Sequence, residues 1–557
     1  MIIQSILDLV ALLYHKGVQD VVICPGSRSA PISIAFYRFA KFNIKIIFDE
    51  RSAGYIGLGI SLFTQKPTVL VCTSGTAALN FYPSICEAYY QKIPLIVITA
   101  DRPSEWIDQG DGQTIRQNNV FINHVKKSYN LPYDLSHPDS KWFFNRLCNE
   151  AIEYCKTPPL GPVHLNIPVR EPFYPEKDEK FTFNLPQIIK KASVQSNCTV
   201  EQVKMLASQL HDKKVILFVG QANFEEKIHQ LVDSFCKKHK IVLIADRISN
   251  IPAAINLHEL ILLQPDCQTF KPDIVLTLGE AVLSKTFKQF VRKNKNAIQH
   301  WHIGQNEIFA PDVFQCLQFC FDIDVASFFK QLSSESFFGS SEYFNLWNEK
   351  NKKITHHVIQ RLENLPYGEF LATYLICKNI KNNETLHVAN SMPIRYVNII
   401  PNTFFKIFCN RGTSGIDGSN STAVGYAMQD NRQNYLLTGD MSFLYDKNAF
   451  WHPYEINNLK IIVLNNYGGG IFRIIDGPSQ LPELEELFVT QQKFKTKMIA
   501  EHYEFQYLSS SNMTELVSTL KFFFDAPQKT VLEIFTNGSN DAQIFNDFYT
   551  FFKRITI

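Results

Sequence analysis

Short, continuous apolar runs recur along the whole chain, and they constrain its fold more than any other feature. In the first block they lie at 21–24 (VVIC), 44–48 (IKIIF), 68–73 (TVLVCT), 94–100 (PLIVITA) and 162–169 (PVHLNIPV, as a closing strand). Runs without polar alternation are typical of parallel strands that are buried on both faces. Small residues and a helix-like segment follow each run, so the pattern predicts a doubly wound α/β domain.

The same pattern recurs twice further along the chain. Apolar runs that predict further strands lie at 214–220, 240–246, 272–279, 385–390, 434–440, 460–466 and 529–536. A polar, Pro- and Lys-rich stretch at 170–197 reads as a linker, and the pattern fades again at 333–344. We therefore expect three α/β domains with mainly parallel sheets, at residues 1–180, 195–340 and 350–557.

The composition excludes several functions before any motif is considered. The 55 basic and 53 acidic residues leave a net charge of +2, so we expect neither nucleic-acid binding nor attachment to a membrane surface. No apolar run approaches the length of about 18 residues that a membrane span needs. The start of the chain, MIIQSILDLVALLYHKG, reads as an amphipathic helix without a basic region or cleavage site, so we expect no signal peptide.

The 12 cysteines are scattered through the 557 residues and form no dense framework. Cys316 and Cys320 make a lone CxxxC without a second pair, so we expect no zinc site. Scattered cysteines in a long chain favour a reducing compartment. The expected location is therefore the cytoplasm.

Two acids end one of the apolar runs, in the stretch IKIIFDERSAG at 44–54. An unpaired carboxylate is costly to bury at the end of a buried strand, and burial raises its pKa. A carboxylate here can cap the helix that follows through its first backbone N–H groups, and this role suits Asp49. Capping by Asp49 leaves Glu50 without an explanation.

A second polar cluster lies in the last block, in GDMSFLYDKNAFWHPYEINNLKIIVLNNYGGGIF at 439–472. Asp440 and Asn466 each end a predicted strand, and the carboxyl ends of adjacent parallel strands meet at one edge of a sheet. Their oxygens, with a backbone carbonyl, suit a hard cation such as Mg²⁺, and Ser442 at a helix start can bind phosphate. Each half alone would be an ordinary strand-to-helix turn, but the combination is much more specific.

This arrangement resembles the diphosphate–Mg²⁺ motif of thiamine diphosphate enzymes, with Gly-Asp-Met where that family usually has Gly-Asp-Gly. The resemblance implies bound thiamine diphosphate with Mg²⁺, or with Mn²⁺ as an alternative. It also implies an acid in the first domain that hydrogen-bonds the aminopyrimidine ring, and Glu50 in FDERSAG matches that position. A raised pKa helps such an acid share its proton.

The resemblance extends to individual cofactor contacts. The segment TSGTAALN at 73–80 matches another stretch that these enzymes use near the cofactor. Ile416 would wedge beneath the cofactor, although plain core packing would also explain it. The implied metal ligands are Asp440, Asn466 and Gly468. The implied cofactor-binding residues are Glu50, Ser74, Gly75, Ile416, Gly439, Asp440, Ser442, Asn466 and Gly468.

Further stretches resemble one family of these enzymes. They are CPGSRSAPI (24–32), TADRP (99–103), GQTIRQ (112–117), NSMPIR (390–395) and NRGTSGIDG (410–418). Together they look like the family of 2-succinyl-5-enolpyruvyl-6-hydroxy-3-cyclohexene-1-carboxylate (SEPHCHC) synthases of menaquinone biosynthesis. The resemblance implies that 2-oxoglutarate is decarboxylated and that its succinyl unit adds to isochorismate, giving SEPHCHC and CO₂.

Arginines in these stretches agree with that chemistry. Both substrates are dianions, so their site needs several fixed cations, preferably arginines for bidentate contacts. Four arginines follow predicted strands and would converge on one cleft, although a surface ion pair explains any single one equally well. The implied catalytic residues are Glu50, Gln113, Arg28, Ser391, Arg395 and Arg411. The implied substrate contacts are Arg28, Arg102 and Lys285 for isochorismate, Ser391 and Arg395 for the succinyl carboxylate, and Arg411, Gln113 and Phe472 near the reacting carbons.

Two positions depart from the family pattern. Gly112 stands where the family often has Asn, and Thr286 stands where a second basic residue often follows the position of Lys285. For Lys285 itself, a solvated surface lysine is an equally good interpretation. None of the 15 histidines falls in these motifs, which fits a cofactor that supplies most of the acid–base chemistry.

Three alternatives stay open at this point. A carboligase or decarboxylase for a smaller 2-oxo acid would need fewer arginines. A non-catalytic protein of this fold would lack the activating acid or the metal pair. The middle block could bind FAD, but it shows no Gly-rich dinucleotide loop, which favours a structural or regulatory role. Cofactor half-sites on two domains imply a homodimer or homotetramer with shared active sites.

Overall fold

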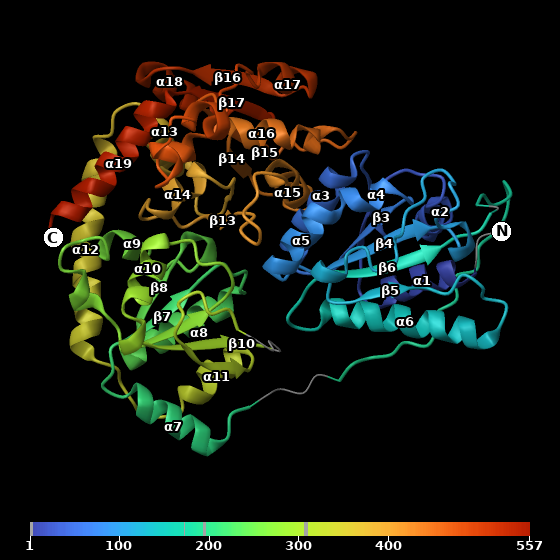
Figure 1. Ribbon diagram of the computed structural model, residues 1–557, viewed down its shortest axis with the longest axis horizontal. Coiled ribbons are helices and arrows are strands. Elements are labelled where there is room, and N and C mark those ends of the chain that lie inside the picture. Colours follow the sequence, from blue (N-terminus) through green and yellow to red (C-terminus); the bar gives the residue numbers. More distant parts are fainter. Residues whose placement is uncertain (1–3, 172, 193–196, 306–309) are drawn as a thin grey trace.

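The structure is a computed structural model that describes residues 4–171, 173–192, 197–305 and 310–557. Three parallel sheets, each with its own helices, form three lobes in Figure 1. The predicted fold class is therefore confirmed. In the described part of the chain, no helix has both the length and the apolar character that a membrane crossing requires.

The first sheet has the strand order β2-β1-β3-β4-β6-β5. Its central strands are fully buried because helices cover both faces, as the continuous apolar runs predict. The strands are β1 (Asp20–Ile23), β2 (Asn43–Ile46), β3 (Thr68–Cys72), β4 (Leu95–Asp101), β5 (Ser128–Asn130) and β6 (Val163–Pro168). The helices are α1 (Gln4–His15), α2 (Ala30–Phe39), α3 (Glu50–Thr64), α4 (Thr76–Asn80), α5 (Tyr82–Gln91) and α6 (Pro138–Lys156).

Two expectations for this sheet are wrong. The run at 44–48 forms an edge strand, β2, whose residues are half-buried or exposed, so it is not covered on both faces. The run at 162–169 does not close the sheet, because the three-residue strand β5 lies outside β6. The apolar pattern did not predict β5 because its sequence, SYN, is short and polar.

The predicted linker at 170–197 has no helix or strand in its described part, and residues 172 and 193–196 lie outside the described residues. Its described part is nevertheless tied to the first domain. Lys16 donates to the carbonyl of Ile189, and Arg38 donates to the carbonyl of Glu179. The segment therefore follows the surface of the first domain.

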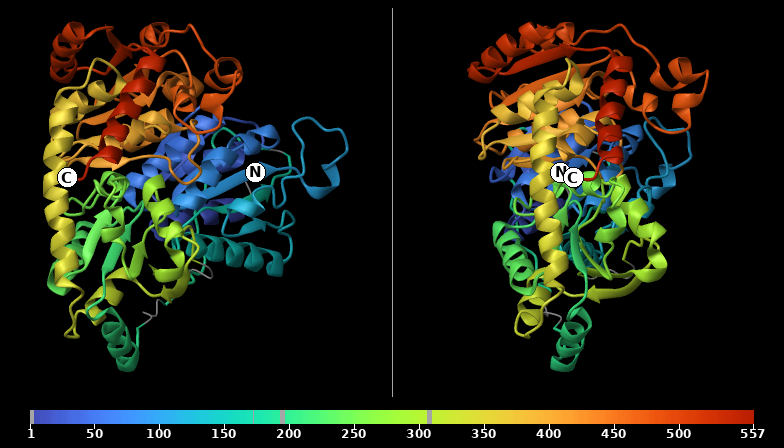
Figure 2. Two further views of the ribbon diagram at one scale, coloured as in Figure 1. Left: turned by 60° about the vertical axis from the view of Figure 1, so that its left-hand side comes forward. Right: turned by 90° about the vertical axis from the view of Figure 1, so that its left-hand side faces the viewer.

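The middle sheet has the order β11-β10-β9-β7-β8. Its strands are β7 (Val215–Val219), β8 (Val242–Ala245), β9 (Ile274–Leu278), β10 (Gln299–Gly304) and β11 (Leu317–Asp322). Its helices are α7 (Val200–Leu210), α8 (Glu226–His239), α9 (His258–Ile261), α10 (Lys285–Lys293) and α11 (Val325–Leu332). The long helix α12 (Ser341–Glu363) follows and runs along the middle and third lobes (Figure 2).

The third sheet has the order β13-β12-β14-β15-β17-β16, which repeats the strand order of the first sheet. Its strands are β12 (Thr385–Val388), β13 (Lys406–Phe408), β14 (Asn434–Gly439), β15 (Leu459–Asn465), β16 (Gln506–Ser510) and β17 (Thr530–Phe535). Its helices are α13 (Glu369–Asn379), α14 (Met392–Asn398), α15 (Ser419–Ala427), α16 (Asp440–Tyr445), α17 (Lys497–His502), α18 (Met513–Asp525) and α19 (Gly538–Arg554).

The first and third domains are joined by a tight crossing of α3 and α15, which lie side by side in Figure 1. A Cβ atom on Gly425 would lie 2.0 Å from the carbonyl oxygen of Ile56, and one on Gly59 would lie 2.1 Å from that of Thr422. Glycine at both positions lets the two backbones meet. One apolar core continues from α3 across this crossing into the third sheet.

Candidate active site

A cavity of about 510 Å³ opens at the carboxyl ends of β12, β14 and β15. This is the edge where parallel α/β sheets bind ligands, because helix N-termini and loops gather there. All the predicted site residues of the third domain line it: Ser391, Arg395, Arg411, Ile416, Gly439, Asp440, Ser442, Asn466, Gly468 and Phe472. The structure therefore brings together one complete half of the predicted site.

The predicted metal ligands lie on one wall of this cavity. Asp440 begins α16 and is buried, and its carboxylate accepts a hydrogen bond from Gln492 at 2.7 Å. Burial raises the pKa of Asp440 to about 6. The Asn466 Oδ1 atom faces the turn at Gly468, whose N–H donates to it at 3.1 Å. A cation bound here would favour the charged form of Asp440 and offset the cost of its burial.

Further buried acids stand behind this wall, and the sequence motifs did not point to them. Glu369 begins α13, accepts from Asn466 Nδ2 at 2.8 Å and accepts from the Tyr396 hydroxyl at 3.1 Å. Burial and the charges of Asp541 and Asp440 raise the pKa of Glu369 well above its ordinary value. Among the described residues, no ion pair neutralises these carboxylates. A divalent cation at Asp440 would favour the charged form of this carboxylate.

The part of the cavity lining that is predicted to contact the cofactor shows further features. Ile416 is 38% exposed at the cavity, which argues against plain core packing. The Ser442 hydroxyl donates to the carbonyl of Ile416 at 2.7 Å and so ties α16 to the loop before α15. A Cβ atom on Gly470 would lie 2.5 Å from Asn466 Nδ2, so the turn after β15 needs glycine to keep that amide in place.

Another part of the cavity lining, here called the arginine wall, carries two arginines and a strained serine. Ser391 has a φ of +76° although it is not glycine, and strain of this kind is often kept at ligand sites. Arg395 donates to the carbonyl of Ser391, and burial together with the charge of Arg411 lowers the pKa of Arg395. Arg411 donates to Asn390 Oδ1 at 3.0 Å, while its buried Nε has no partner. Two neighbouring guanidinium groups with unused donors suit a carboxylate ligand.

The loop that carries Arg411 is held by an acid from the first domain. Glu87 lies on α5 and is fully buried. Its carboxylate accepts from the backbone N–H groups of Gly412 and Thr413, each at 2.7 Å, and from the Thr413 hydroxyl at 2.5 Å. No sequence motif points to Glu87, because it lies on a predicted helix outside every motif.

The first domain holds a second group of predicted residues at the carboxyl end of its own sheet. Arg102 is buried, donates to the Ser74 hydroxyl and pairs with Asp111 at 2.7 Å. Gly75 has a φ of +87°, and a Cβ atom on it would lie 3.1 Å from the backbone oxygen of Gln113. Gln113 itself is exposed. The buried side chain of Gln117 accepts from the Gly75 N–H at 2.7 Å and fixes this turn.

Asp49 has the capping role that the sequence predicts, and Glu50 follows it directly. Asp49 is the N-cap of α3, and its carboxylate accepts from the N–H groups of Arg51 and Ser52, so the capping prediction is confirmed. Glu50 is the first residue of α3 and is half-buried. Burial raises the pKa of Glu50, and the neighbouring charge of Asp49 adds to this effect. A carboxyl with a raised pKa at a strand end is thus present.

Arg28 lies beside Arg102, whose charge adds to burial in lowering the pKa of Arg28. Its Nη1 donates to the carbonyl of Val169 at 2.9 Å, its guanidinium lies 4.3 Å from the ring centre of Phe173, and its buried Nε has no partner. The four predicted arginines therefore form two pairs on two domains. The described residues that line the third-domain cavity include none from the first domain.

The middle domain approaches the arginine wall with α9 and α10. Lys285 is exposed at the start of α10, whereas Lys288 is half-buried and has a pKa lowered by burial, with Arg411 among the charges that act on it. Thr286 donates to Glu259 at 3.1 Å. Burial and the charge of Asp246 raise the pKa of Glu259 to about 7, and Arg395 acts in the opposite direction. Lys288 and Glu259 are candidates that the sequence motifs did not single out.

Comparison with known proteins agrees with this geometry. Residues 7–120 match the family model described as "Thiamine pyrophosphate enzyme, N-terminal TPP binding domain". A SEPHCHC synthase from Cytophaga hutchinsonii is 41% identical over 553 residues, which cover 98% of each chain. Another from Flavobacterium johnsoniae is 36% identical over 99% of this chain and 98% of its own, and one from Bacteroides thetaiotaomicron is 35% identical over 99% of both.

The fold, the paired strand-end motifs and the family model define a thiamine diphosphate-dependent enzyme that performs a carboligation. Identity above 30% over nearly the whole length goes further. The chain belongs to the family of 2-succinyl-5-enolpyruvyl-6-hydroxy-3-cyclohexene-1-carboxylate synthases.

Proposed function

We propose that this enzyme decarboxylates 2-oxoglutarate and joins the remaining succinyl unit to isochorismate, giving SEPHCHC and CO₂ for menaquinone biosynthesis. The observation that carries this proposal is the third-domain cavity, whose lining combines Asp440 and Asn466 with Arg395 and Arg411. A smaller 2-oxo acid would not need the second anion site that these arginines offer.

Thiamine diphosphate, when bound, supplies the electron sink that lets a 2-oxo acid lose CO₂ and its remaining fragment attack an acceptor. Asp440, the Asn466 side chain and the Gly468 carbonyl would hold Mg²⁺, or Mn²⁺ in its place. Ser442 lies in the first turn of α16, where backbone N–H groups favour phosphate oxygens. Ser74, Gly75, Ile416 and Gly439 complete the proposed cofactor contacts.

Glu50 is proposed to hold the proton that the aminopyrimidine ring exchanges. Burial raises its pKa, which favours the protonated form more than in an ordinary exposed glutamate. The acid must come from a first domain, while Asp440 and Asn466 belong to a third domain. Among the described residues of one chain, none from the first domain lines the third-domain cavity.

The arginines are proposed to bind the two substrates. Arg395 and Ser391 would hold the distal carboxylate of 2-oxoglutarate, and Arg411 would lie near both substrates. Their charges attract and orient a dianion in a partly dry cavity. Arg28, Arg102 and Lys285 would contact isochorismate, with Gln113 and Phe472 close to the reacting carbons.

The assembly is proposed to be a homodimer or homotetramer in which Glu50 of one chain faces Asp440 of another. The domain limits 1–180, 195–340 and 350–557 also stay proposals, and the second boundary falls around the start of α12. We further propose a cytoplasmic location, on the cysteine content of the sequence.

The decisive experiment mixes the purified enzyme with thiamine diphosphate, Mg²⁺, 2-oxoglutarate and isochorismate and follows the loss of isochorismate absorbance. The expected result is consumption that requires all four components. Release of CO₂ from 2-oxo acids with isochorismate left intact would keep the cofactor and remove the acceptor from the proposal. Absence of thiamine diphosphate binding would overturn it entirely.

A further inference from the structure

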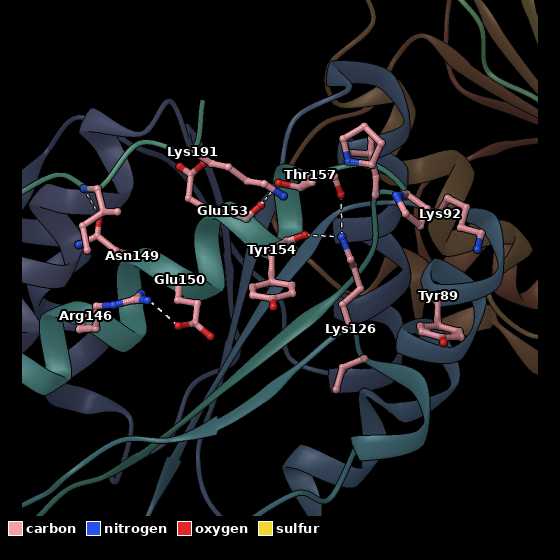
Figure 3. A pocket seen from close by; sticks show the side chains of 15 residues that line it. Tyr89, Lys92, Lys126, Arg146, Asn149, Glu150, Glu153, Tyr154, Thr157 and Lys191 are labelled. Atoms are coloured by element: carbon pink, nitrogen blue, oxygen red, sulfur yellow. Dashed lines mark hydrogen bonds and ion pairs between the residues drawn. The ribbon is translucent and has the colours of Figure 1, made fainter. Parts of the chain in front are cut away.

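A cavity of about 700 Å³ lies in the first domain (Figure 3). It is formed by the end of α5, the segment at 125–126, helix α6, the turn at 157–160 and the segment around 189–191. None of the predicted site residues lines it. It shares no described lining residue with the third-domain cavity, so the catalytic chemistry predicted there does not explain it.

The acids of this cavity are already neutralised. Glu150 pairs with Arg146 at 3.0 Å, one turn away on α6, and also with Lys127. Glu153 pairs with Lys16 at 2.6 Å, and Lys16 has only 3% of its side chain exposed. These carboxylates therefore have cations of their own and do not balance further positive charge in the cavity.

Three lysines in the lining have no such partner. Lys126 donates to the backbone carbonyls of Tyr154 and Thr157. In the described parts of the chain, no ion pair joins a carboxylate to Lys126, Lys92 or Lys191. Burial lowers the pKa of Lys126 to about 8, the Cys155 thiol on α6 acts in the opposite direction, and the charges of Lys191 and Lys92 lower the pKa further. The charges of Lys191 and Lys92 thus act on Lys126.

The rest of the cavity wall is largely apolar. Figure 3 shows the rings of Tyr154 and Tyr89 on either side of the Lys126 side chain. Val125 and Leu160 also line the cavity. A concave wall of this kind, with a few convergent charges, is typical of sites for small organic ligands.

We propose that this cavity is a second ligand site, which binds a small organic anion through Lys92, Lys126 and Lys191 and packs the apolar body of the anion against Tyr89 and Tyr154. The anionic group is a carboxylate or a phosphate, since both accept several hydrogen bonds from ammonium groups. An anion would relieve the repulsion among the three lysines. The proposal does not depend on the reaction proposed for the third-domain cavity.

Isothermal titration calorimetry on the full-length enzyme with Mg²⁺ and thiamine diphosphate tests this site. The probes are phenyl phosphate, benzoate, inorganic phosphate and benzyl alcohol. The first two combine an aromatic ring with a phosphate or a carboxylate. Inorganic phosphate has the anionic group without the ring, and benzyl alcohol has the ring without the charge. The variant is Lys126→Met, and the control is Lys141→Met, which removes the same charge from an exposed position on α6. Both variants keep the active-site arginines, so their difference reports this cavity alone.

The expected result is that phenyl phosphate or benzoate binds at least tenfold more tightly than inorganic phosphate and than benzyl alcohol. Lys126→Met should weaken that binding about tenfold, as expected for the loss of a charged hydrogen-bond donor, and Lys141→Met should leave it unchanged. If Lys126→Met does not fold, Lys191→Glu at an exposed position should weaken binding instead. Equal affinity in the wild type and in all variants, or no binding of either aromatic anion, would overturn the proposal.

Discussion

Single buried side chains hold the arginine wall of the candidate active site. Glu87 is the clearest case, because its carboxylate accepts three hydrogen bonds from Gly412 and Thr413, directly after Arg411. A buried carboxylate that accepts backbone N–H groups fixes a loop more firmly than a neutral acceptor does. Glu87 therefore acts as a positioning residue for Arg411, from a different domain.

Replacing this carboxylate should impair one substrate selectively. Glu87→Gln removes the charge and one acceptor but keeps the volume, so Arg411 should lose its fixed position. We expect the KM for 2-oxoglutarate to rise about tenfold, because a change of this size corresponds to the loss of one charged hydrogen bond. The affinity for thiamine diphosphate should be unchanged. Steady-state kinetics with each substrate varied measures the split. Glu153→Gln, at a first-domain acid paired with Lys16, is the control, and equal losses in both variants would contradict a positioning role.

Glu259 predicts a pH dependence for the same cavity. Its pKa of about 7 lies above the ordinary value, so the carboxyl is protonated at pH 6 and ionised at pH 8. Ionisation places a negative charge beside Arg395 and weakens the attraction of that arginine for a dianion. We expect the KM for 2-oxoglutarate to rise about three- to tenfold between pH 6 and pH 8. This is the size of effect expected when a screened charge acts over several ångströms.

The matched variant for this pH effect is Glu259→Gln, which cannot ionise. Its KM for 2-oxoglutarate should stay near the low-pH value of the wild type across the range. The control is the KM for isochorismate, which we expect to change little through this group. If Glu259→Gln shows the same change of KM with pH as the wild type, a group other than Glu259 is responsible for that change.

The residues found from the sequence and those missed differ in a simple physical way. Asp440, Asn466 and Arg411 follow strands in recognisable motifs, and the topology alone places them at one edge of the sheet. Glu87 and Glu259 come from helices of other domains. Their role depends on how domains pack, which no local pattern encodes.

At the scale of elements, an uninterrupted apolar run decides which strands the sequence reveals. The central strands β3, β4 and β15 are fully buried and were predicted from continuous apolar runs. The edge strands β5, β11, β13 and β16 carry polar or exposed residues, and the inner strand β10 contains His300 and His302, so the same pattern missed all five. An edge strand needs only one covered face and leaves a weaker signal.

The crossing of α3 and α15 gives an element-scale prediction. Gly425→Ala would place a methyl group 2.0 Å from the carbonyl oxygen of Ile56. Overpacking of this kind costs about 1–3 kcal/mol, which exceeds the gain of up to about 1 kcal/mol from better helix propensity. We expect lower thermal stability, measured by scanning calorimetry. Gly538→Ala in α19 is the control, since its nearest neighbour would lie 3.6 Å away, and an equal effect of both changes would argue against a tight crossing.

At the scale of the whole molecule, the two outer domains share one strand order, and each presents half of a site at the carboxyl edge of its sheet. The sequence showed three similar blocks but could not demonstrate this repeat. Within one chain, α3 and α15 bring the domains together, and no first-domain residue that the structure describes lines the third-domain cavity. Two copies related by a two-fold axis can supply the missing walls to each other.

Mixing two inactive variants tests this arrangement directly. Glu50→Gln removes the proposed acid from the first-domain half, and Asp440→Asn removes a proposed metal ligand from the third-domain half. Each variant alone should lose almost all activity. If each active site takes Glu50 and Asp440 from different chains, a mixed dimer has one site with both changes and one site with neither. Random exchange of equal amounts should then restore about a quarter of the wild-type activity, as expected for a symmetric dimer with shared sites.

Activity is measured after unfolding and refolding the two variants together, with wild type treated identically as the control. If both residues came from the same chain, every site in the mixture would carry one change, and no activity would return.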